Sequence, residues 1–286
     1  MSPTTIPIRS IAAPSEEESI AYMPMPREMT TFSMPSVPEP GPGSDVAGAC
    51  DVLAQFLARY GAWLDAGGEL ARIELKDLPA ESLRVLNETL GEGEVAVTAD
   101  ADHEIRIQET VFTGVWREQH FSGADGLLHD YLLGAPVPPL VGTLARERAS
   151  ARLRELALPA GAMNVPALIH ELQEAMDRSA AGALAHVVNL TLLPLSPEDT
   201  AHIDAVLEGG SVVILSRGFG NCRISSTAAR DVWRVQYFNN MQTLILNTIE
   251  VTVMPEAAVA AREDLVETRA RLADLVDWMS EQVADA

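Results

Sequence analysis

VWREQHF at residues 115–121 and VWRVQYF at residues 232–238 are near copies of each other. They lie 117 residues apart, and the same offset aligns residues 73–121 with residues 190–238 without a gap. Fourteen of these 49 aligned positions are identical. A period of this size is too long for a solenoid repeat and has the length of a small domain. The sequence therefore predicts two duplicated halves packed about a pseudo-two-fold axis.

Alternation along the two copies separates a constant face from a variable one, because neighbouring side chains of a strand point to opposite faces. The constant face carries valine, arginine, glutamine and phenylalanine, whereas the variable face shares only the tryptophan. In the second copy Arg234 and Gln236 are constant and Tyr237 is variable. Either the constant polar residues satisfy backbone groups at the pseudo-symmetric seam, or they offer a guanidinium and an amide to a partner.

The surrounding pattern predicts an α+β fold in which each half is a strand, a helix and a run of antiparallel strands. In the first half we expect a strand at 71–75, a helix opened by Pro79, and strands at 94–98, 104–112 and 115–121. In the second half we expect a strand at 187–193, a helix opened by Pro197, and strands at 212–216, 222–227, 232–238 and 243–253. Connecting and C-terminal helices complete the prediction.

Four segments follow from this organisation. They are a Pro/Met-rich extended segment at 1–44, an N-terminal helix with the first repeat at 45–140, a helical connector at 141–186, and the second repeat with a C-terminal helix at 187–286. The first segment holds nine of the eighteen prolines, so it is either a disordered tail or a segment that folds on binding. Leu265, Leu272, Leu275 and Met279 form an apolar stripe that predicts packing on the body or pairing in a homodimer.

Charge and cysteine usage narrow the class of protein. The formal net charge of −21 argues against nucleic acid and anionic membrane surfaces as partners, and it permits a basic partner or serves solubility alone. Cys50 and Cys222 provide neither a disulfide framework nor a CxxC motif. We find no apolar stretch of membrane-spanning length and no secretory signal, so the sequence predicts a cytoplasmic protein.

Residues that could carry chemistry form no recognisable constellation. No histidine pairs with another histidine or a cysteine at metal-ligand spacing, and no serine stands in a nucleophile elbow. The G-x-G spacing in 216–222 precedes a strand instead of a helix and therefore predicts a β-turn. Asp199 and Asp204 lie on a predicted helix and are expected to be solvated. The sequence thus predicts no enzyme, no catalytic residue, no metal site and no cofactor.

Several stretches resemble one known family. Residues 187–199, 214–224, 232–241 and 243–251 are similar to the C-terminal region of the HupH/HyaF family of nickel–iron hydrogenase expression/formation proteins. Residues 161–168 and the proline-rich residues 34–40 also resemble that family. The resemblance covers most of the chain and is densest over 161–256.

The resemblance implies a non-enzymatic assembly chaperone for an uptake hydrogenase. It also implies two partners, which are the hydrogenase small-subunit precursor and a thioredoxin-like maturation companion. A redox or cluster-handling carrier of the same pathway and a pure scaffold are the alternatives. Two cysteines are too few to ligate an iron–sulfur cluster that needs about four.

A partner-binding site is expected on the second repeat, where the resemblance is densest. The residues that differ from the first repeat there, or that flank the differences, are Arg234, Gln236, Tyr237, Asn239, Asn240 and Met241. A tyrosine beside two amides could hold an extended peptide by β-addition. Alternatively, the two asparagines only supply turn residues.

Overall fold

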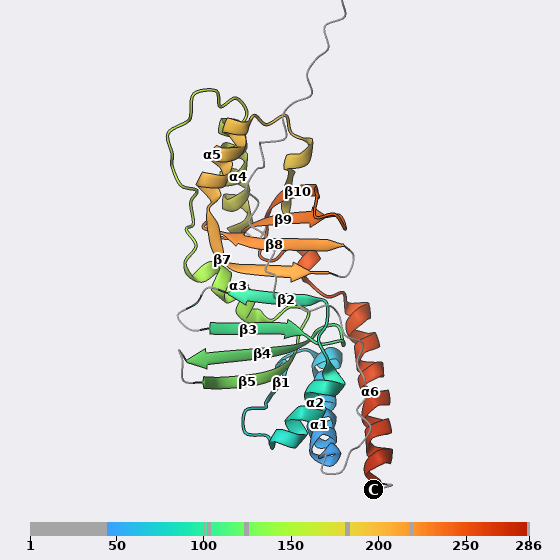
Figure 1. Ribbon diagram of the computed structural model, residues 1–286. Helices are drawn as coiled ribbons and strands as arrows, with labels where there is room; N and C mark the ends of the chain where they lie inside the picture. Colours follow the sequence, from blue (N-terminus) through green and yellow to red (C-terminus); the bar gives the residue numbers. More distant parts are fainter. Residues whose placement is uncertain are drawn as a thin grey trace, which may run out of the picture. The chain divides into compact units, whose positions relative to one another are not determined.

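The structure is a computed structural model that describes residues 45–99, 101, 104–122, 126–180, 184–217 and 220–284 (Figure 1). The chain divides into two units, Met1–Thr31 and Phe32–Ala286, and all that follows concerns the described part of the second unit. The extended segment predicted at 1–44 lies outside the described residues. None of the helices formed by described residues combines the length and the hydropathy needed to cross a membrane.

The elements of the first half follow the predicted order, with one extra strand. They are α1 (Val46–Ala66), β1 (Ala71–Glu74), α2 (Ala80–Leu90), β2 (Val95–Ala99), β3 (Glu104–Glu109), β4 (Val115–Ser122), β5 (Gly126–Gly134) and α3 (Pro139–Glu147). Strand β5 is not predicted from the sequence. Its Leu132 and Leu133 are buried on opposite faces of the sheet, in two different apolar clusters, so the strand lacks the polar alternation that marks the others.

The second half repeats this order. It consists of α4 (Val165–Ala180), β6 (His186–Asn189), the 3-10 turn η1 (Leu190–Leu192), α5 (Pro197–Leu207), β7 (Gly209–Ser216), β8 (Asn221–Thr227), β9 (Val232–Phe238), β10 (Leu244–Val251), the 3-10 turn η2 (Glu256–Ala258) and α6 (Arg262–Ala284). In both halves a helix, a strand and a second helix precede four strands and a final helix. This composition confirms the α+β fold class.

All ten strands of the described residues form one antiparallel sheet in the order β1-β5-β4-β3-β2-β7-β8-β9-β10-β6. The order reads the same from both ends once each strand is exchanged for its counterpart, and β2 and β7 meet at the centre (Figure 1). Only β1 and β6 are therefore edge strands. The other eight use both backbone edges within the sheet.

The register of the two halves also agrees. Arg106 of β3 pairs with Gln119 of β4, and 117 residues later Arg223 of β8 pairs with Gln236 of β9. The first strand is the exception, because Val188 and not Leu190 occupies the place of Ile73. The gapless alignment is therefore wrong at that strand by two residues. The shared order and register support the duplication, which remains a prediction about origin.

The tryptophan common to both copies has the same environment in each half. Trp116 and Trp233 are each 2% exposed. The indole Nε1 of Trp116 donates to the carbonyl of Ala135 at 2.9 Å, and that of Trp233 donates to the carbonyl of Thr252 at 3.1 Å. These acceptors are again 117 residues apart. Burial of a large ring with its N–H satisfied explains why both strands carry tryptophan.

Two equivalent glycines allow a close approach of chain segments. A Cβ at Gly93 would lie 2.2 Å from the carbonyl oxygen of Thr110, and a Cβ at Gly210 would lie 2.6 Å from that of Thr227. Both distances are too short for any side chain. The glycines shared by the repeats are therefore required where the strand after each helix passes the β3 or β8 backbone.

Three apolar clusters hold the sheet and helices together. One lies under α1, α2 and α6, and its buried members include Phe56, Tyr60, Leu86, Leu132 and Leu272. A central cluster includes Ile107, Trp116, Val141, Ile214 and Trp233. A third lies under α4 and α5 and includes Leu172, Val188, Ile203, Val232 and Ile249.

Helix α6 packs on the body, as one of the two predicted arrangements requires. Leu265, Leu272 and Met279 are buried at 3%, 1% and 1% exposure in the cluster of the first half, and Leu275 is partly buried against it. The last helix of the chain thus crosses from the second half to the first, where it lies alongside α1 (Figure 1).

Candidate partner-binding site

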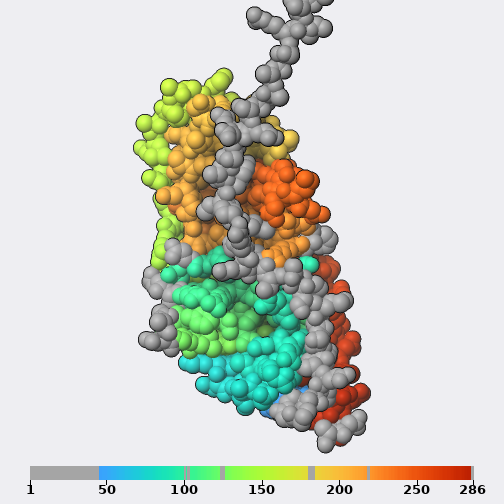
Figure 2. Space-filling view, in the orientation of Figure 1, coloured from blue at the N-terminus to red at the C-terminus, as the bar shows by residue number. Residues whose placement is uncertain are grey.

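The residues proposed from the sequence lie together at the end of β9 and in the loop that follows it. Arg234, Gln236 and Tyr237 belong to β9, and Asn239, Asn240 and Met241 lead into β10. Atoms of this region, drawn in orange, reach the surface on the face seen in Figure 2. The six residues form one nearly continuous stretch of the chain, although their side chains have different roles.

Strand β9 cannot accept an added strand. It is hydrogen-bonded to β8 on one side and to β10 on the other, so both backbone edges are already occupied. The predicted β-addition at this strand is therefore wrong, because strand addition needs a free edge. Any partner contact by these residues has to use side chains or the loop.

Arg234 is engaged within the chain. Its Nε donates to Oδ1 of Asn247 on β10 at 3.0 Å, and its Nη1 forms an ion pair with Asp204 of α5. The guanidinium thereby ties a helix to two strands of the sheet. This arrangement favours the interpretation that the constant arginine has a structural role within the fold.

The counterpart Arg117 makes the same contacts with the partner types exchanged. It forms an ion pair with Asp130 on β5 and donates to Oδ1 of Asn87 on α2 at 2.6 Å. Each arginine thus has one carboxylate and one amide, but the carboxylate is on the strand in the first half and on the helix in the second. Asp130 is 1% exposed, whereas the Asp204 side chain is 52% exposed.

Tyr237 is half-buried beside Cys222 of β8. Burial raises the pKa of the Tyr237 phenol to about 12, and the neighbouring Cys222 adds to this shift. Burial likewise raises the pKa of the Cys222 thiol to about 11, despite a hydrogen bond with Tyr237. Both groups are protonated at neutral pH, so this pair supplies no nucleophilic thiolate.

The loop after β9 is a turn held by an asparagine. Oδ1 of Asn239 accepts hydrogen bonds from the backbone N–H groups of Met241 and Thr243, each at 2.9 Å. Gln242 adopts a positive φ of 63°. Asn239 is therefore a turn residue, as the alternative interpretation predicts, while Asn240 is exposed and Met241 is 85% exposed.

Asp199 is not solvated, so that expectation is wrong. Its carboxylate forms a capping box with Ser196 at the start of α5 and also accepts from the backbone N–H groups of Met163, Asn164 and Val165. Burial alone would raise the pKa of this carboxyl, but the backbone hydrogen bonds outweigh burial and lower the pKa to about 2. Asp199 therefore joins α4 to α5. Asp204 is exposed, as expected, although it pairs with Arg234.

Metal-ligating residues do not assemble among the described residues. No group of three or more histidine, cysteine, aspartate or glutamate side chains lies close enough to hold a metal ion there. Cys50 is buried against the carbonyl of Val276 and the hydroxyl of Ser280, far along the chain from Cys222. His103 lies outside the described residues.

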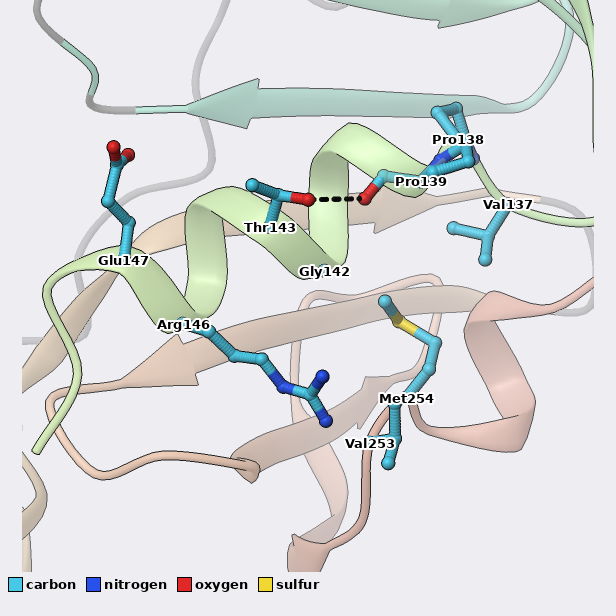
Figure 3. Close-up of a pocket in the computed structure, with 9 residues that line it drawn as sticks. All are labelled: Val137, Pro138, Pro139, Gly142, Thr143, Arg146, Glu147, Val253 and Met254. Atoms are coloured by element: carbon cyan, nitrogen blue, oxygen red, sulfur yellow. Dashed lines mark hydrogen bonds between the residues drawn. The ribbon is translucent and has the colours of Figure 1, made fainter. Parts of the chain in front are cut away.

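A pocket of about 580 Å³ lies between α3 and the segment after β10 (Figure 3). Its lining residues are Val137, Pro138, Pro139, Gly142, Thr143, Arg146, Glu147, Val253 and Met254. The Thr143 hydroxyl donates to the Pro139 carbonyl at 3.2 Å, and Arg146 donates to Asp231 at 2.6 Å. Thr143 and Arg146 are thus engaged within the fold, and most of the other lining residues are apolar.

A further set of exposed apolar residues of the second half is not indicated by the sequence pattern. They follow the edge strand β6 and its neighbours and include Leu184, Val187, Leu192 and Ile245. Single exposed apolar residues are ordinary, and only the strand order shows that these share one edge. No sequence signal could identify them without that order.

Comparison with known proteins gives a consistent result. The family model described as "HupH hydrogenase expression protein, C-terminal conserved region" matches residues 46–157 and 162–279. The two matched segments correspond to the two halves of the sheet with their first helices.

Curated relatives match over nearly the whole chain. The hydrogenase expression/formation protein HoxQ of Azotobacter vinelandii is 44% identical over 266 residues, which cover 91% of this chain and 92% of that protein. HoxQ of Cupriavidus necator is 40% identical and covers 93% of both chains. The hydrogenase-1 operon protein HyaF of Escherichia coli is 32% identical and covers 75% of both chains.

A solved structure of the hydrogenase expression protein HupH from Thiobacillus denitrificans is 28% identical. It has a TM-score of 0.37 and covers 43% of this chain and 97% of that chain. The family match and the full-length relatives together establish membership. This chain belongs to the HupH family of hydrogenase expression/formation proteins.

Proposed function

We propose that this protein is a non-enzymatic assembly chaperone that binds a protein partner during maturation of an uptake nickel–iron hydrogenase. The family membership supports the maturation role. One observation carries the choice of binding over catalysis. The guanidinium of Arg234 on β9 is engaged inside the fold, whereas the exposed side chains of the following loop are uncharged and include an amide and a thioether, Asn240 and Met241.

The ionisation of the buried groups also supports binding over redox chemistry. A thiol with a pKa of about 11 carries little thiolate at neutral pH, so Cys222 is a poor nucleophile and a poor metal ligand. The alternative, a redox or cluster-handling carrier, would need ligands contributed by a partner.

The partner in this proposal is the precursor of the hydrogenase small subunit, which the protein meets in the cytoplasm, together with a thioredoxin-like companion. The formal charge of −21 suits a partner segment that carries basic residues, because opposite charge accelerates and orients association. A homodimer is compatible with this role.

A pull-down with the purified small-subunit precursor tests the proposal. We expect the affinity-tagged wild-type chain to retain the precursor. Combined substitution Asn240→Ala and Met241→Ala should weaken retention, because both side chains are exposed in the loop. Val266→Ala is the control, since Val266 is 52% exposed on α6, away from the loop.

Two outcomes would contradict the proposal. Failure of the wild-type chain to retain the precursor would remove the chaperone role. A visible absorbance band in anaerobically purified protein would favour the carrier. Undiminished retention by the loop variant would remove only the assignment of these residues.

A further inference from the structure

The two edge strands of the sheet differ in how they meet solvent. The backbone carbonyl of Arg72 in β1 accepts a hydrogen bond from the Arg59 guanidinium of α1 at 2.7 Å. β1 also carries the charged Arg72 and Glu74. Charged side chains and capped backbone groups are the usual protection of a sheet edge against further pairing. The β1 edge therefore has built-in protection.

The described residues give the opposite edge no such protection. β6 reads His186-Val187-Val188-Asn189 and pairs only with β10 among the described strands. Val187 is 54% exposed, and Leu184, just before the strand, is 93% exposed. An apolar edge strand left open in this way is a ready template for strand addition.

Apolar side chains continue beyond the end of β6. The Thr191 hydroxyl accepts from the backbone N–H of Asn247 at 2.8 Å, which places η1 beside β10. Leu192 of η1 is 79% exposed, and Ile245 of β10 is 56% exposed. These residues extend the open edge into an apolar border that consists of Leu184, Val187, Leu192 and Ile245.

The segments of this border and the helix beside it, α4, carry more acidic than basic side chains. Residues 184–199 and 239–251 contain no lysine or arginine. Beside β6, Glu171 of α4 is 49% exposed and lies 2.8 Å from His186. On the same helix Glu174 is 59% exposed and forms an ion pair with Arg178 at 3.7 Å. A segment bound along this edge would therefore gain from basic side chains and lose from acidic ones.

We propose that the outer edge of β6, with its apolar border, binds an extended segment of a partner protein that carries lysine or arginine among apolar residues. The segment adds to the sheet as an eleventh strand through main-chain hydrogen bonds. The proposal rests on the chaperone function above and specifies the surface and the chemistry of the partner segment.

Hydrogen exchange measures whether the edge is open and whether it becomes occupied. In the free chain, the N–H groups of 186–189 that do not face β10 should exchange faster than those of the interior strand β8. Saturation with the small-subunit precursor should slow them at least tenfold. Slow exchange in the free chain would show that the edge is already covered and would overturn the proposal.

Matched substitutions test the edge by affinity. Val187→Lys places an edge lysine and a repelling charge on β6, and we expect precursor binding to weaken at least tenfold. Val187→Ile keeps the apolar edge and should bind within twofold of wild type. Val266→Lys is the control, because it makes the same valine-to-lysine change at a 52% exposed position on α6. Circular dichroism should be the same for all four proteins, and wild-type affinity of Val187→Lys would overturn the proposal.

Two synthetic peptides separate this proposal from the chaperone function. One alternates valine with lysine, and the other alternates valine with glutamate. Only the lysine peptide should slow exchange in β6. If the wild-type chain retains no precursor, the chaperone function is contradicted, but the two peptides still test whether the β6 edge binds an added strand. Equal protection by both peptides, or by neither, overturns the proposal. A dimer that Val187→Lys converts to a monomer also overturns it, since the occupant is then a second copy.

Discussion

At the scale of single residues, the two constant arginines each contact one carboxylate and one amide, but the positions of the carboxylate and the amide are exchanged between the halves. Arg117 and Arg234 are similarly covered, with side-chain exposures of 14% and 16%. Their carboxylates are not, since Asp130 is buried on a strand and Asp204 is exposed on a helix. A buried charge that loses its partner is costly, whereas an exposed ion pair contributes little. The two halves therefore depend unequally on the same interaction.

We expect Asp130→Asn to destabilise the protein by about 3–5 kcal/mol, because it leaves the Arg117 guanidinium without its buried counterion. Asp204→Asn should cost less than about 1 kcal/mol, since that carboxylate is solvated. Urea unfolding monitored by tryptophan fluorescence measures both values. Equal losses for the two variants would contradict the unequal dependence.

Glu109 is a second residue with a testable consequence. It is 7% exposed at the end of β3 and accepts a hydrogen bond from the Gly114 N–H at 2.9 Å. Burial raises the pKa of its carboxyl to about 7, and the nearby Glu94 and Asp264 add to the shift. A folded-state pKa above the unfolded value of 4.5 means that the folded protein binds more protons between these two values.

The stability contributed by protonated Glu109 is therefore complete below pH 4.5 and is lost as the pH rises through 7. Glu109→Gln removes the titrating carboxyl and with it this loss. The unfolding free energy of the variant minus that of the wild type should therefore be larger at pH 8 than at pH 5, by up to about 3 kcal/mol. Urea unfolding of both proteins at the two pH values provides the comparison. An identical difference at pH 5 and pH 8 would show that the carboxyl does not titrate in this range.

At the scale of elements, sequence patterns identify strands better than they identify neighbours. β9 can be recognised from the sequence because Arg234 and Gln236 alternate with the apolar Trp233, Val235 and Tyr237 of the other face. β5 is hidden because Leu132 and Leu133 enter different apolar clusters. The position of β9 inside the sheet depends on which strand edges meet, and no local pattern records this. The six candidate residues are nearly consecutive in the chain, and strand addition, the binding mode expected for them, is one that an interior strand cannot use. Their role in partner binding remains a prediction.

Asp199 shows the same limit at a helix terminus. The Ser-Pro-Glu-Asp start of α5 is a recognisable helix signal. The N–H groups of 163–165, which share the same carboxylate, arrive from a segment more than thirty residues earlier. Because Asp199 accepts hydrogen bonds at the starts of two helices, its role becomes visible only when the relative positions of α4 and α5 are known. The sequence alone shows an ordinary surface aspartate.

At the scale of the whole described body, α6 couples the halves. It follows the second half in sequence, yet Leu272 and Met279 complete the apolar cluster of the first. The Tyr60 hydroxyl of α1 also donates to the Leu265 carbonyl at 3.3 Å, and Thr268 donates to the Thr113 carbonyl at 2.9 Å. The first half thus depends on the end of the chain.

Leu272→Ala should destabilise the first half by about 2–5 kcal/mol, because it removes a fully buried side chain and leaves a cavity. Val266→Ala on the exposed side of α6 should change stability by less than about 0.5 kcal/mol. Unfolding followed by fluorescence, with Trp63 beside this cluster, detects the loss. A Leu272→Ala protein as stable as the control would show that α6 does not support this core.

The crossing of α6 has a consequence for biosynthesis. Leu132 of β5 leaves the ribosome about 140 residues before Leu272, and Phe56 of α1 leaves it more than 200 residues before Leu272. At translation rates of about 5–20 residues per second, the shorter interval lasts roughly 7–28 s. The N-terminal half therefore cannot complete its apolar core until α6 has been synthesised. During this interval the nascent chain exposes apolar surface of the kind that chaperones cover on other proteins.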